Sequence, residues 1–469
     1  MARLAQKKKD RHAPTDIPMP KETSILEDDF TMDDLSNALK DLKTGKACGI
    51  DDICNEQISH FGVIARKWLL DLFNYCTNNL KIPKMWRKSR IIAILKHGKS
   101  PDEAKSYRPI SLLPHFYKLY ERLILNRLLP TSEQNIIPEQ AGFRPGKSCT
   151  SQLLNLTEHI ESGFENKQKT ASVFVDLSAA FDTVNHNLLH KKLLKFTNGD
   201  AHLTNLISCL LNDRRFYVDL DGKKSRWHTQ SNGVPQGSVL SPFLFNIYTN
   251  DQPIHPDTRS FIYADDLAIA AQGPTFEGLE ATLSDALSEL SIYYKRNCLK
   301  ANPTKTQACA FHLNNREAGR KLRIIWEGTV LDHVENPVYL GVTLDRTLSF
   351  KRHIEKTKAK VNSRNSIIRK LANSKWGAHP STLRTSSLAL VFSVAEYACP
   401  VWGHSKHAKK LDPALNETCR IITGCLKPTN VNSLYLLAGI APPDIRRLVA
   451  TKKEKLYQET NHRHSLHNK

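Results

Sequence analysis

FIYADDLAIA, residues 261–270, places two acidic residues at the centre of an otherwise apolar decapeptide. Four residues of high strand propensity or small size stand on each side of Asp265 and Asp266, which is the pattern of a β-hairpin with an acidic turn. An unpartnered carboxylate is costly to bury, and a second like charge beside it adds to the cost. The sequence therefore predicts a positively charged partner, such as a divalent cation, at this turn.

A third acidic residue closes another predicted strand. SVFVDL (residues 172–177) is rich in β-branched and aromatic residues and reaches Asp176 near its end. Oxygen ligands from Asp176, Asp265 and Asp266 suit Mg²⁺, with Mn²⁺ as the alternative, and no neighbouring His or Cys indicates zinc. Two such ions about 4 Å apart can activate a hydroxyl group and stabilise a leaving pyrophosphate. Nucleases also use carboxylates, and a single Asp is as readily a turn or cap residue, so the acidic residues alone leave the reaction open.

The charge of the chain predicts a polyanionic partner. The 469 residues carry a formal net charge of +20. Residues 351–469 hold 22 Lys and Arg against 7 Asp and Glu, a difference of +15 in about a quarter of the chain. Basicity concentrated in this way favours binding to a nucleic acid backbone, while a basic surface without a specific partner is the alternative.

Other compositional features exclude several classes of protein. No apolar run approaches the roughly 18 residues of a membrane-spanning helix, and we expect no membrane partner and no signal peptide. The ten cysteines contain no C-x-x-C pair, so neither a zinc ribbon nor a zinc knuckle is expected. Reduced, buried thiols indicate an intracellular protein of the cytoplasm or the nucleus.

The periodicity of the apolar residues predicts a mixed fold. Helical spacing is found over residues 31–43, 61–80, 116–129 and 277–292, and short strands are expected at 91–95, 172–177 and 261–270. This order predicts an α+β fold with helices on one face of a small antiparallel sheet. After residue 350 the pattern is entirely helical, with Ile354, Val361 and Ile368 seven residues apart. Residues 1–24 are polar and rich in Lys and Pro, and we expect them to be disordered.

Three motifs occur in the order in which they are found in reverse transcriptases, which they closely resemble: SVFVDLSAAFD (172–182), GVPQGSVLSPFLFNIY (233–248) and YADD (263–266). Four further stretches extend the resemblance: YRPISLL (107–113), QAGFRPGKS (140–148), LKANPTKTQ (299–307) and YLGVTLD (339–345). The set covers about residues 30–350 and is similar to polymerases of non-LTR, jockey-like retrotransposons. The later segments AEYACPVWG (395–403) and LYLLAGIAPPDIRR (434–447) resemble the region that follows the polymerase in such elements.

The resemblance implies roles for the acidic residues. Asp176 and Asp265 would each ligate two Mg²⁺ ions, and Asp266 would support the site with weaker direct coordination. The backbone carbonyl of Leu177 would be a further metal ligand.

The resemblance also implies six nucleotide-binding residues, which are Lys96, Arg108, Phe181, Gln236, Gly237 and Lys305. The two fingers cations, Lys96 and Arg108, would hold the triphosphate, although Lys99 is a rival to Lys96. Phe181 would exclude a ribose 2′ hydroxyl, with a plain core role as the alternative. Gln236 and Gly237 would form a turn beneath the template–nucleotide pair. Lys305 would act near the pyrophosphate as a general acid, with a structural role as the alternative.

The architecture that the resemblance implies is a right-hand polymerase with helical fingers, a small antiparallel-sheet palm and a helical thumb. We assign residues 25–170 to the fingers, 171–345 to the palm, and 346–469 to a basic helical thumb and C-terminal region. The predicted activity is RNA-directed DNA synthesis, in which deoxynucleotides extend a DNA primer on an RNA template. We expect no endonuclease domain before residue 30 and no ribonuclease H domain after the thumb. The alternatives are a catalytically silent remnant that only binds nucleic acid and, less consistent with the C-terminal resemblance, an intron-encoded maturase.

Overall fold

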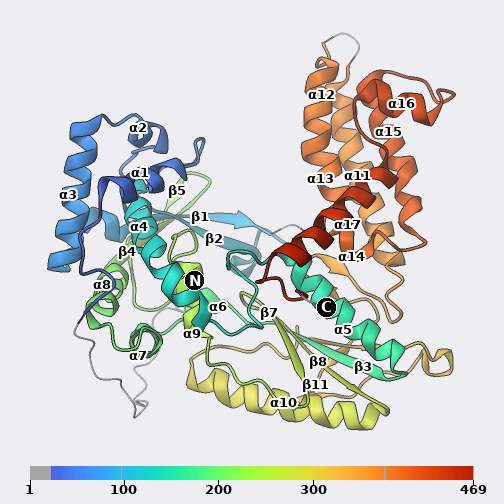
Figure 1. Ribbon diagram of the computed structural model, residues 1–469, viewed down its shortest axis with the longest axis horizontal. Helices are drawn as coiled ribbons and strands as arrows, with labels where there is room; N and C mark the ends of the chain where they lie inside the picture. The colour runs from blue at the N-terminus through green and yellow to red at the C-terminus, as the bar shows by residue number, and fades with distance from the viewer. Residues whose placement is uncertain (1–22, 97, 374–375, 468–469) are drawn as a thin grey trace. The chain divides into compact units, whose positions relative to one another are not determined.

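The computed structural model describes residues 23–96, 98–373 and 376–467, which form two compact units (Figure 1). Unit 1 consists of Met1–Ile137, Leu177–Pro253 and Leu290–Ala301, and unit 2 consists of Pro138–Asp176, Ile254–Glu289 and Asn302–Lys469. Each unit is therefore built from three separate stretches of chain. Apart from its last two residues, the segment 1–24 that we predicted to be disordered lies outside the described residues.

Three helices of unit 1 confirm those predicted at 31–43, 61–80 and 116–129, and the others were not predicted individually. They are α1 (Met32–Lys40), α2 (Asn55–Ser59), α3 (Val63–Asn79), α4 (His115–Ser132), α6 (Ala180–Thr183), α7 (His186–Phe196), α8 (Ala201–Leu211) and α9 (Ser241–Tyr248), with 3₁₀ turns η1 (Lys84–Arg87), η2 (Ala104–Ser106) and η3 (Glu133–Asn135). A capping box begins α1. The Thr31 hydroxyl accepts a bond from the Asp34 amide at 3.1 Å, and the Asp34 carboxylate accepts one from the Thr31 amide at 3.0 Å. These bonds satisfy amide groups that a helix start leaves unpaired.

The sheet of unit 1 has the strand order β2-β1-β4-β5, with β6 also paired to β4. Its strands are β1 (Lys88–Leu95), β2 (Tyr107–Leu112), β4 (Arg214–Leu220), β5 (Lys223–Lys224) and β6 (His228–Gln230). β1 is antiparallel to β2 and parallel to β4. The hairpin of β1 and β2 thus carries the YRPISLL motif on its second strand.

The sheet of unit 2 has the order β12-β9-β3-β8-β7, so β3 lies at its centre. Its strands are β3 (Lys169–Val175), β7 (Arg259–Tyr263), β8 (Asp266–Gly273), β9 (Gln307–Phe311) and β12 (Asp332–His333). β3 pairs antiparallel with both β8 and β9, as predicted, whereas β12 is parallel to β9. The prediction of a purely antiparallel sheet is therefore wrong at this edge, where β12 is only two residues long and carries no apolar run that could have revealed it.

Both faces of this sheet are buried, whereas the prediction placed helices on one face and did not address the other. Helix α5 (Cys149–Glu165) runs along one face, where Phe174 and Ala268 belong to the same buried cluster as Leu153 (Figure 1). On the other face, Val173 and its partner Ile269 are at most 2% exposed. Strands that are buried on both faces have apolar runs without alternating polar residues. The runs SVFV and LAIAA in this sequence are of that kind and already indicated burial on both faces.

Helix α10 (Phe276–Arg296) confirms the predicted amphipathic helix, because all four Leu residues of its stripe are buried: Leu279, Leu283, Leu287 and Leu290. Two short hairpins complete the strands, namely β10 (Ile325–Trp326) with β11 (Thr329–Val330), and β13 (Val338–Tyr339) with β14 (Val342–Thr343). A 3₁₀ turn, η4 (Asn315–Glu317), lies between β9 and β10.

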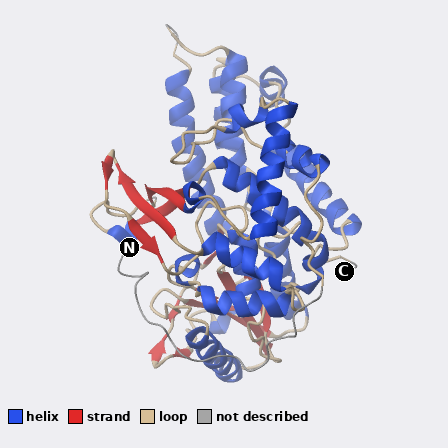
Figure 2. Cartoon of the chain, turned by 90° about the vertical axis from the view of Figure 1, so that its left-hand side faces the viewer, coloured by secondary structure: helices blue, strands red, loops and turns tan. Residues whose placement is uncertain are grey.

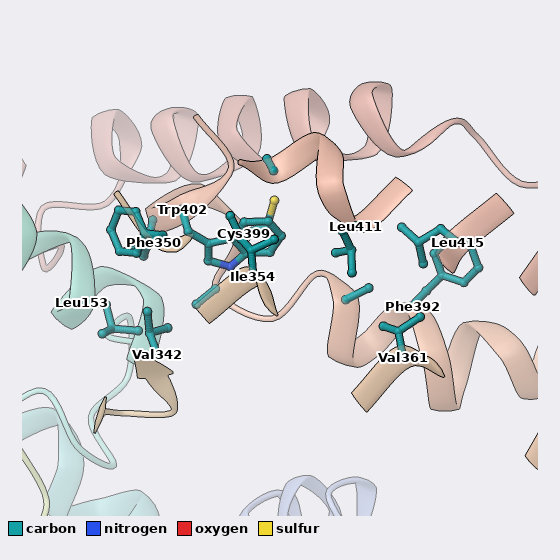
Figure 3. Packing of buried hydrophobic residues seen from close by; sticks show 14 of the residues in the cluster. Leu153, Val342, Phe350, Ile354, Val361, Phe392, Cys399, Trp402, Leu411 and Leu415 are labelled. Carbon is teal, nitrogen blue, oxygen red and sulfur yellow. The ribbon is translucent and has the colours of Figure 1, made fainter. Parts of the chain in front are cut away.

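All the regular elements that the structure describes after residue 350 are helical, as predicted, and loops join them (Figure 2). Its helices are α11 (Lys351–Leu371), α12 (Pro380–Ser387), α13 (Ser393–Ala395), α14 (Cys399–Trp402), α15 (Asp412–Thr423), α16 (Val431–Ala438) and α17 (Pro443–Thr460), with a π-helical segment η5 (Leu388–Phe392) and a 3₁₀ turn η6 (Ala408–Leu411). Ile354, Val361 and Ile368 are all buried on the inner face of α11. Figure 3 shows how this face packs against residues of the later helices, such as Trp402 and Leu415.

All ten cysteines are free thiols, four of them buried and six partly exposed, so the prediction of buried thiols holds for fewer than half. In the described part of the chain, no helix is both long and apolar enough to cross a membrane.

Candidate active site

The acidic pair lies at the hairpin between β7 and β8. Tyr263 pairs with Asp266, which leaves Ala264 and Asp265 as a two-residue turn. Ala264 has a φ of +58°, in the left-handed region that tight hairpin turns require. The turn therefore fixes Asp265 at its second position and makes Asp266 the first residue of β8.

The segment 139–142 holds this turn in place. The Gln140 side chain accepts hydrogen bonds from the amides of Ala264 (2.8 Å) and Gly142 (2.7 Å), and donates one to the Ala264 carbonyl (3.2 Å). A Cβ atom on Gly142 would lie 2.2 Å from the Ala264 nitrogen, so only glycine allows this approach. Both residues stand in the QAGFRPGKS motif, but no local pattern in the sequence predicted a role for either.

Asp176 lies beside the hairpin because β3 pairs with β8. Val175 is the partner of Leu267, and continuing the register by one residue places Asp176 opposite Asp266. Residues directly opposite in an antiparallel pair have Cβ atoms about 5 Å apart. The structure thus brings the three predicted acidic residues to one edge of the sheet of unit 2.

The turn from Asn302 to Thr306 anchors Asp176. The Asn302 side-chain amide donates to the Asp176 carboxylate at 3.2 Å, and the Asn302 backbone amide donates to the Asp176 carbonyl at 3.0 Å. The Thr306 hydroxyl accepts from the Asp176 amide at 3.2 Å. These two residues were also missed, although the LKANPTKTQ motif contains them.

The like charges at this edge act on one another. The pKa of Asp266 is raised to about 6, first by desolvation and then by the charges of Asp265 and Asp176. The Asp266 residue is nevertheless exposed, so a solvated cation can reach it. The raised pKa marks an excess of negative charge that a cation would relieve.

Three carboxylates are the hard donors that Mg²⁺ and Mn²⁺ prefer, so the donor chemistry of this edge fits such an ion. Among the described residues, however, no three His, Cys, Asp or Glu side chains are arranged closely enough to hold a metal as they stand. Metal coordination by Asp176, Leu177, Asp265 and Asp266 therefore stays a prediction.

Lys305 belongs to unit 2 together with the acidic residues. It is exposed within the turn that anchors Asp176, and its backbone amide donates to the Asn302 carbonyl at 3.0 Å. Leu177, the residue after Asp176, is the first residue of a stretch of unit 1 and forms an isolated bridge with Ala301.

The two predicted fingers cations lie on the hairpin of unit 1. Arg108 on β2 pairs with Ile94 on β1, and Lys96 follows two residues later, so strand alternation places Lys96 and Arg108 on the same face. Arg108 is exposed, and so is Lys99, whereas Lys96 is partly buried. The Lys96 ammonium group donates to the Lys105 carbonyl at 3.0 Å.

Phe181 lies in α6 of unit 1 and is partly exposed. Its ring stacks on that of Phe245, with centroids 4.5 Å apart and planes 15° from parallel. The backbone carbonyl of Phe181 accepts from the Val234 amide at 2.9 Å, which links α6 to the strand-to-helix turn before α9. One side of the ring is therefore supported by the core.

Gln236 and Gly237 form a turn beside β2 in the same unit. The Ser111 amide donates to the Gln236 carbonyl at 2.8 Å, and the Gln236 side chain donates to Asp182 at 3.3 Å. Gly237 has a φ of +128°, and a Cβ atom there would lie 2.6 Å from the Ser111 carbonyl oxygen. The acidic residues and Lys305 thus belong to unit 2, whereas Lys96, Arg108, Phe181, Gln236 and Gly237 belong to unit 1.

Comparison with known proteins identifies the family. Residues 94–344 match the family described as Reverse transcriptase (RNA-dependent DNA polymerase), and this range is more than half of the chain. The probable RNA-directed DNA polymerase from transposon BS of Drosophila melanogaster is 34% identical over 421 residues, which cover 87% of this chain and 46% of that protein. The RNA-directed DNA polymerase from mobile element jockey of the same species is 33% identical over 334 residues, 69% of this chain and 36% of that protein.

The chain spans less than half the length of these curated relatives. A solved structure of apo telomerase from Candida tropicalis aligns with 60% of this chain and 59% of its own at a TM-score of 0.39 and 13% identity. The sequence motifs, the acidic sheet edge and the family match agree with one another. The chain belongs to the reverse transcriptase family and, within it, to the LINE-type reverse transcriptases of non-LTR retrotransposons.

Proposed function

We propose that this chain is an RNA-directed DNA polymerase that extends the 3′ end of a DNA primer on an RNA template with deoxynucleoside triphosphates. The observation that carries the proposal is the convergence of Asp176, Asp265 and Asp266 at one sheet edge, where desolvation and then the charges of Asp265 and Asp176 raise the pKa of Asp266 to about 6. The basic residues of the chain, at a net charge of +20, supply the attraction for the template and the primer.

The cofactor in this proposal is a pair of Mg²⁺ ions, with Mn²⁺ as the alternative, held by the three carboxylates and the Leu177 carbonyl. When bound, such a pair lowers the pKa of the attacking 3′ hydroxyl and neutralises charge on the leaving pyrophosphate. The residues of the chain itself provide the positioning. Asn302 orients Asp176, and Gln140 fixes the turn that carries Asp265.

The proposed substrate-binding roles rest on the position, contacts and exposure of each side chain. Arg108 and Lys96 share one face of the β1–β2 hairpin and bind the triphosphate through charge-assisted bonds. Phe181, supported by Phe245, blocks a ribose 2′ hydroxyl. Lys305, which is exposed, holds a proton for the leaving oxygen.

The proposed architecture is a right hand with fingers at residues 25–170, a palm at 171–345 and a basic helical thumb and C-terminal region at 346–469. These bounds follow the motifs of the sequence and differ from those of the two compact units. Supporting the assignment, the acidic hairpin and all but the first two residues of β3 lie within the proposed palm.

Primer extension by the purified chain tests the proposal. With an oligonucleotide-primed RNA, deoxynucleotides and Mg²⁺, we expect extension by the parent and a loss of about 10³-fold or more in the rate with Asp265→Asn. The control is Asp257→Asn, which removes an exposed carboxylate just before β7 and should extend normally. If the parent bound primed RNA without extending it, the chain would be a nucleic acid-binding protein and the proposal would be wrong.

A further inference from the structure

Glu121 is a carboxylate buried inside unit 1 that the proposed mechanism does not use. It lies in α4, and only 1% of the residue is exposed. A carboxylate buried to this degree costs several kcal/mol unless hydrogen bonds replace its hydration. Its partners therefore indicate which part of the chain depends on it.

Both oxygens of Glu121 bind the segment that follows Gly237. The Ser238 hydroxyl donates to one oxygen, and the Val239 amide donates to the other at 2.8 Å. The Ser238 oxygen also accepts from the Ser241 amide at 3.1 Å, at the start of α9. Glu121 thus ties the Gln236–Gly237 turn and the beginning of α9 to α4.

The opposite side of the turn is held just as closely by Ser111 on β2. Its amide donates to the Gln236 carbonyl, and its own carbonyl oxygen occupies the space that a Cβ atom of Gly237 would need. The turn is fixed between β2 on one side and the Glu121 carboxylate on the other. Neither contact was visible in the sequence, because Ser111 and Glu121 each lie more than 100 residues before the turn that they contact.

A buried cation balances the charge of Glu121. Arg214 is 1% exposed, and its guanidinium carbon lies 5.1 Å from the centre of the Tyr117 ring, one turn of α4 before Glu121. Burial raises the pKa of Glu121, while the bonds from Ser238 and Val239 and the charge of Arg214 oppose that rise. Glu121 therefore belongs to a buried polar network, in which hydrogen bonds and an opposite charge offset the cost of desolvating the carboxylate.

We infer that Glu121 is a positioning residue for the Gln236–Gly237 turn, and that its two hydrogen bonds set the affinity for the incoming nucleotide. The inference rests on the proposed function, in which this turn lies beneath the template–nucleotide pair. Glu121 touches no substrate; it acts by fixing the backbone that does.

Steady-state primer extension with three variants tests the inference. Glu121→Met keeps the side-chain volume and removes both acceptors, so the nucleotide KM should rise about tenfold or more with a smaller change in kcat. Ser238→Ala removes one of the two bonds and should raise KM by a smaller factor. Glu121→Gln should restore most of the affinity, because its amide accepts from Val239 and donates to Ser238.

The matched control is Asn126→Met, an exposed position on the same helix that should leave KM unchanged. If Glu121→Met does not fold, because Arg214 is left without its counter-charge, the KM of Ser238→Ala tests the inference in its place. Unchanged nucleotide KM in the folded variants, or an equal rise of KM in Asn126→Met, would overturn the inference.

A second measurement separates this inference from the proposed function. Hydrogen exchange at the Gly237 and Val239 amides should accelerate in Glu121→Met and stay at the parental rate in Asn126→Met, whether or not the parent extends a primer. An inactive parent with this exchange pattern would reject the polymerase and keep the positioning role. An active parent with exchange and KM both unchanged in Glu121→Met would reject the positioning role alone.

Discussion

Each acidic residue of the site is held by the chain in a different way. Asp176 follows the central strand and is oriented by Asn302, Asp265 occupies the second position of a two-residue turn, and Asp266 begins β8. Strand pattern and charge pointed to these three residues, and motif resemblance gave each its role. The residues that hold them, Gln140 and Asn302, act over 124 and 126 positions of chain, so no local pattern could have assigned their roles.

The raised pKa of Asp266 predicts a pH-dependent stability. The folded chain holds the proton of Asp266 more tightly than the unfolded chain, whose ordinary value is 3.8. The stabilising contribution is therefore fully present below about pH 4 and is lost as the pH rises through about 6. Asp266→Asn should remove this loss. As the pH rises from about 4 to 6, the melting temperature of the variant should therefore increase relative to that of the parent, with both measured in the presence of a chelator.

The same melting series in Mg²⁺ tests whether the ion relieves the charge. Above pH 6, Mg²⁺ should raise the melting temperature of the parent more than that of Asp266→Asn, because the variant offers one ionised ligand fewer. Asp257→Asn should follow the parent throughout. If the difference in melting temperature between Asp266→Asn and the parent stayed constant from pH 4 to 7, the pKa of Asp266 would not be raised, and the prediction would be wrong.

The ring of Phe181 predicts selectivity for the sugar. Phe181→Val removes the ring and leaves Phe245 in place, so ribonucleotides should enter more readily. We expect the ratio of ribonucleotide to deoxynucleotide kcat/KM to rise on the order of tenfold. An equal decline for both sugars would assign Phe181 a core role instead.

At the scale of elements, apolar periodicity was sufficient for α1, α3, α4, α10 and α11 and for the acidic hairpin, whereas helices such as α5 and α8 were not predicted. The heptad of α11 and the Leu stripe of α10 are buried as expected. The parallel pairing of β12 with β9 was missed, because two-residue strands carry no period. Burial of the second sheet face was not predicted. The apolar runs of β3 and β8 lack polar alternation, which indicates burial on both faces, but they were interpreted only as strand propensity.

The contact between the hairpin turn and the 139–142 segment predicts that Gly142 cannot be replaced. Gly142→Ala would force a Cβ atom against the Ala264 nitrogen, which must move the turn that carries Asp265. We expect a loss of about 1–3 kcal/mol in the free energy of unfolding and a larger relative loss of primer extension. Gly319→Ala is the matched control, because its Cβ atom would meet nothing within 4 Å. Equal stability and activity in both variants would contradict the contact.

At the scale of the molecule, the basic C-terminal region is part of the core of unit 2 and not an appended tail. Leu153 and Phe174 share one buried cluster with Ile354, Trp402 and Ile440. Deleting residues 351–469 would therefore remove the support of α5, and weaker binding by such a deletion would say little about charge. The charge must be tested by substitution on the exposed surface of α11.

The expected result concerns the salt dependence of binding to primed RNA. Replacing the exposed Lys351, Lys360 and Lys370 by Gln should reduce the slope of log K against log salt by about 0.7–0.9 for each phosphate group that a lysine no longer neutralises. The matched control replaces the exposed Lys43, Lys81 and Lys84 of unit 1. An equal reduction in the control would mean that basicity in general, and not the surface of α11, binds the strand.

The assembly of unit 2 from three stretches of chain has a consequence for its synthesis. When Asp176 and the hairpin have left the ribosome, β9 and the helices that pack against α5 are still to be translated. Long-range partners of this kind are late to form and leave apolar surface open in the meantime. A chain whose translation stops early therefore carries all three acidic residues without the scaffold that assembles them, and intact translation becomes a condition for activity.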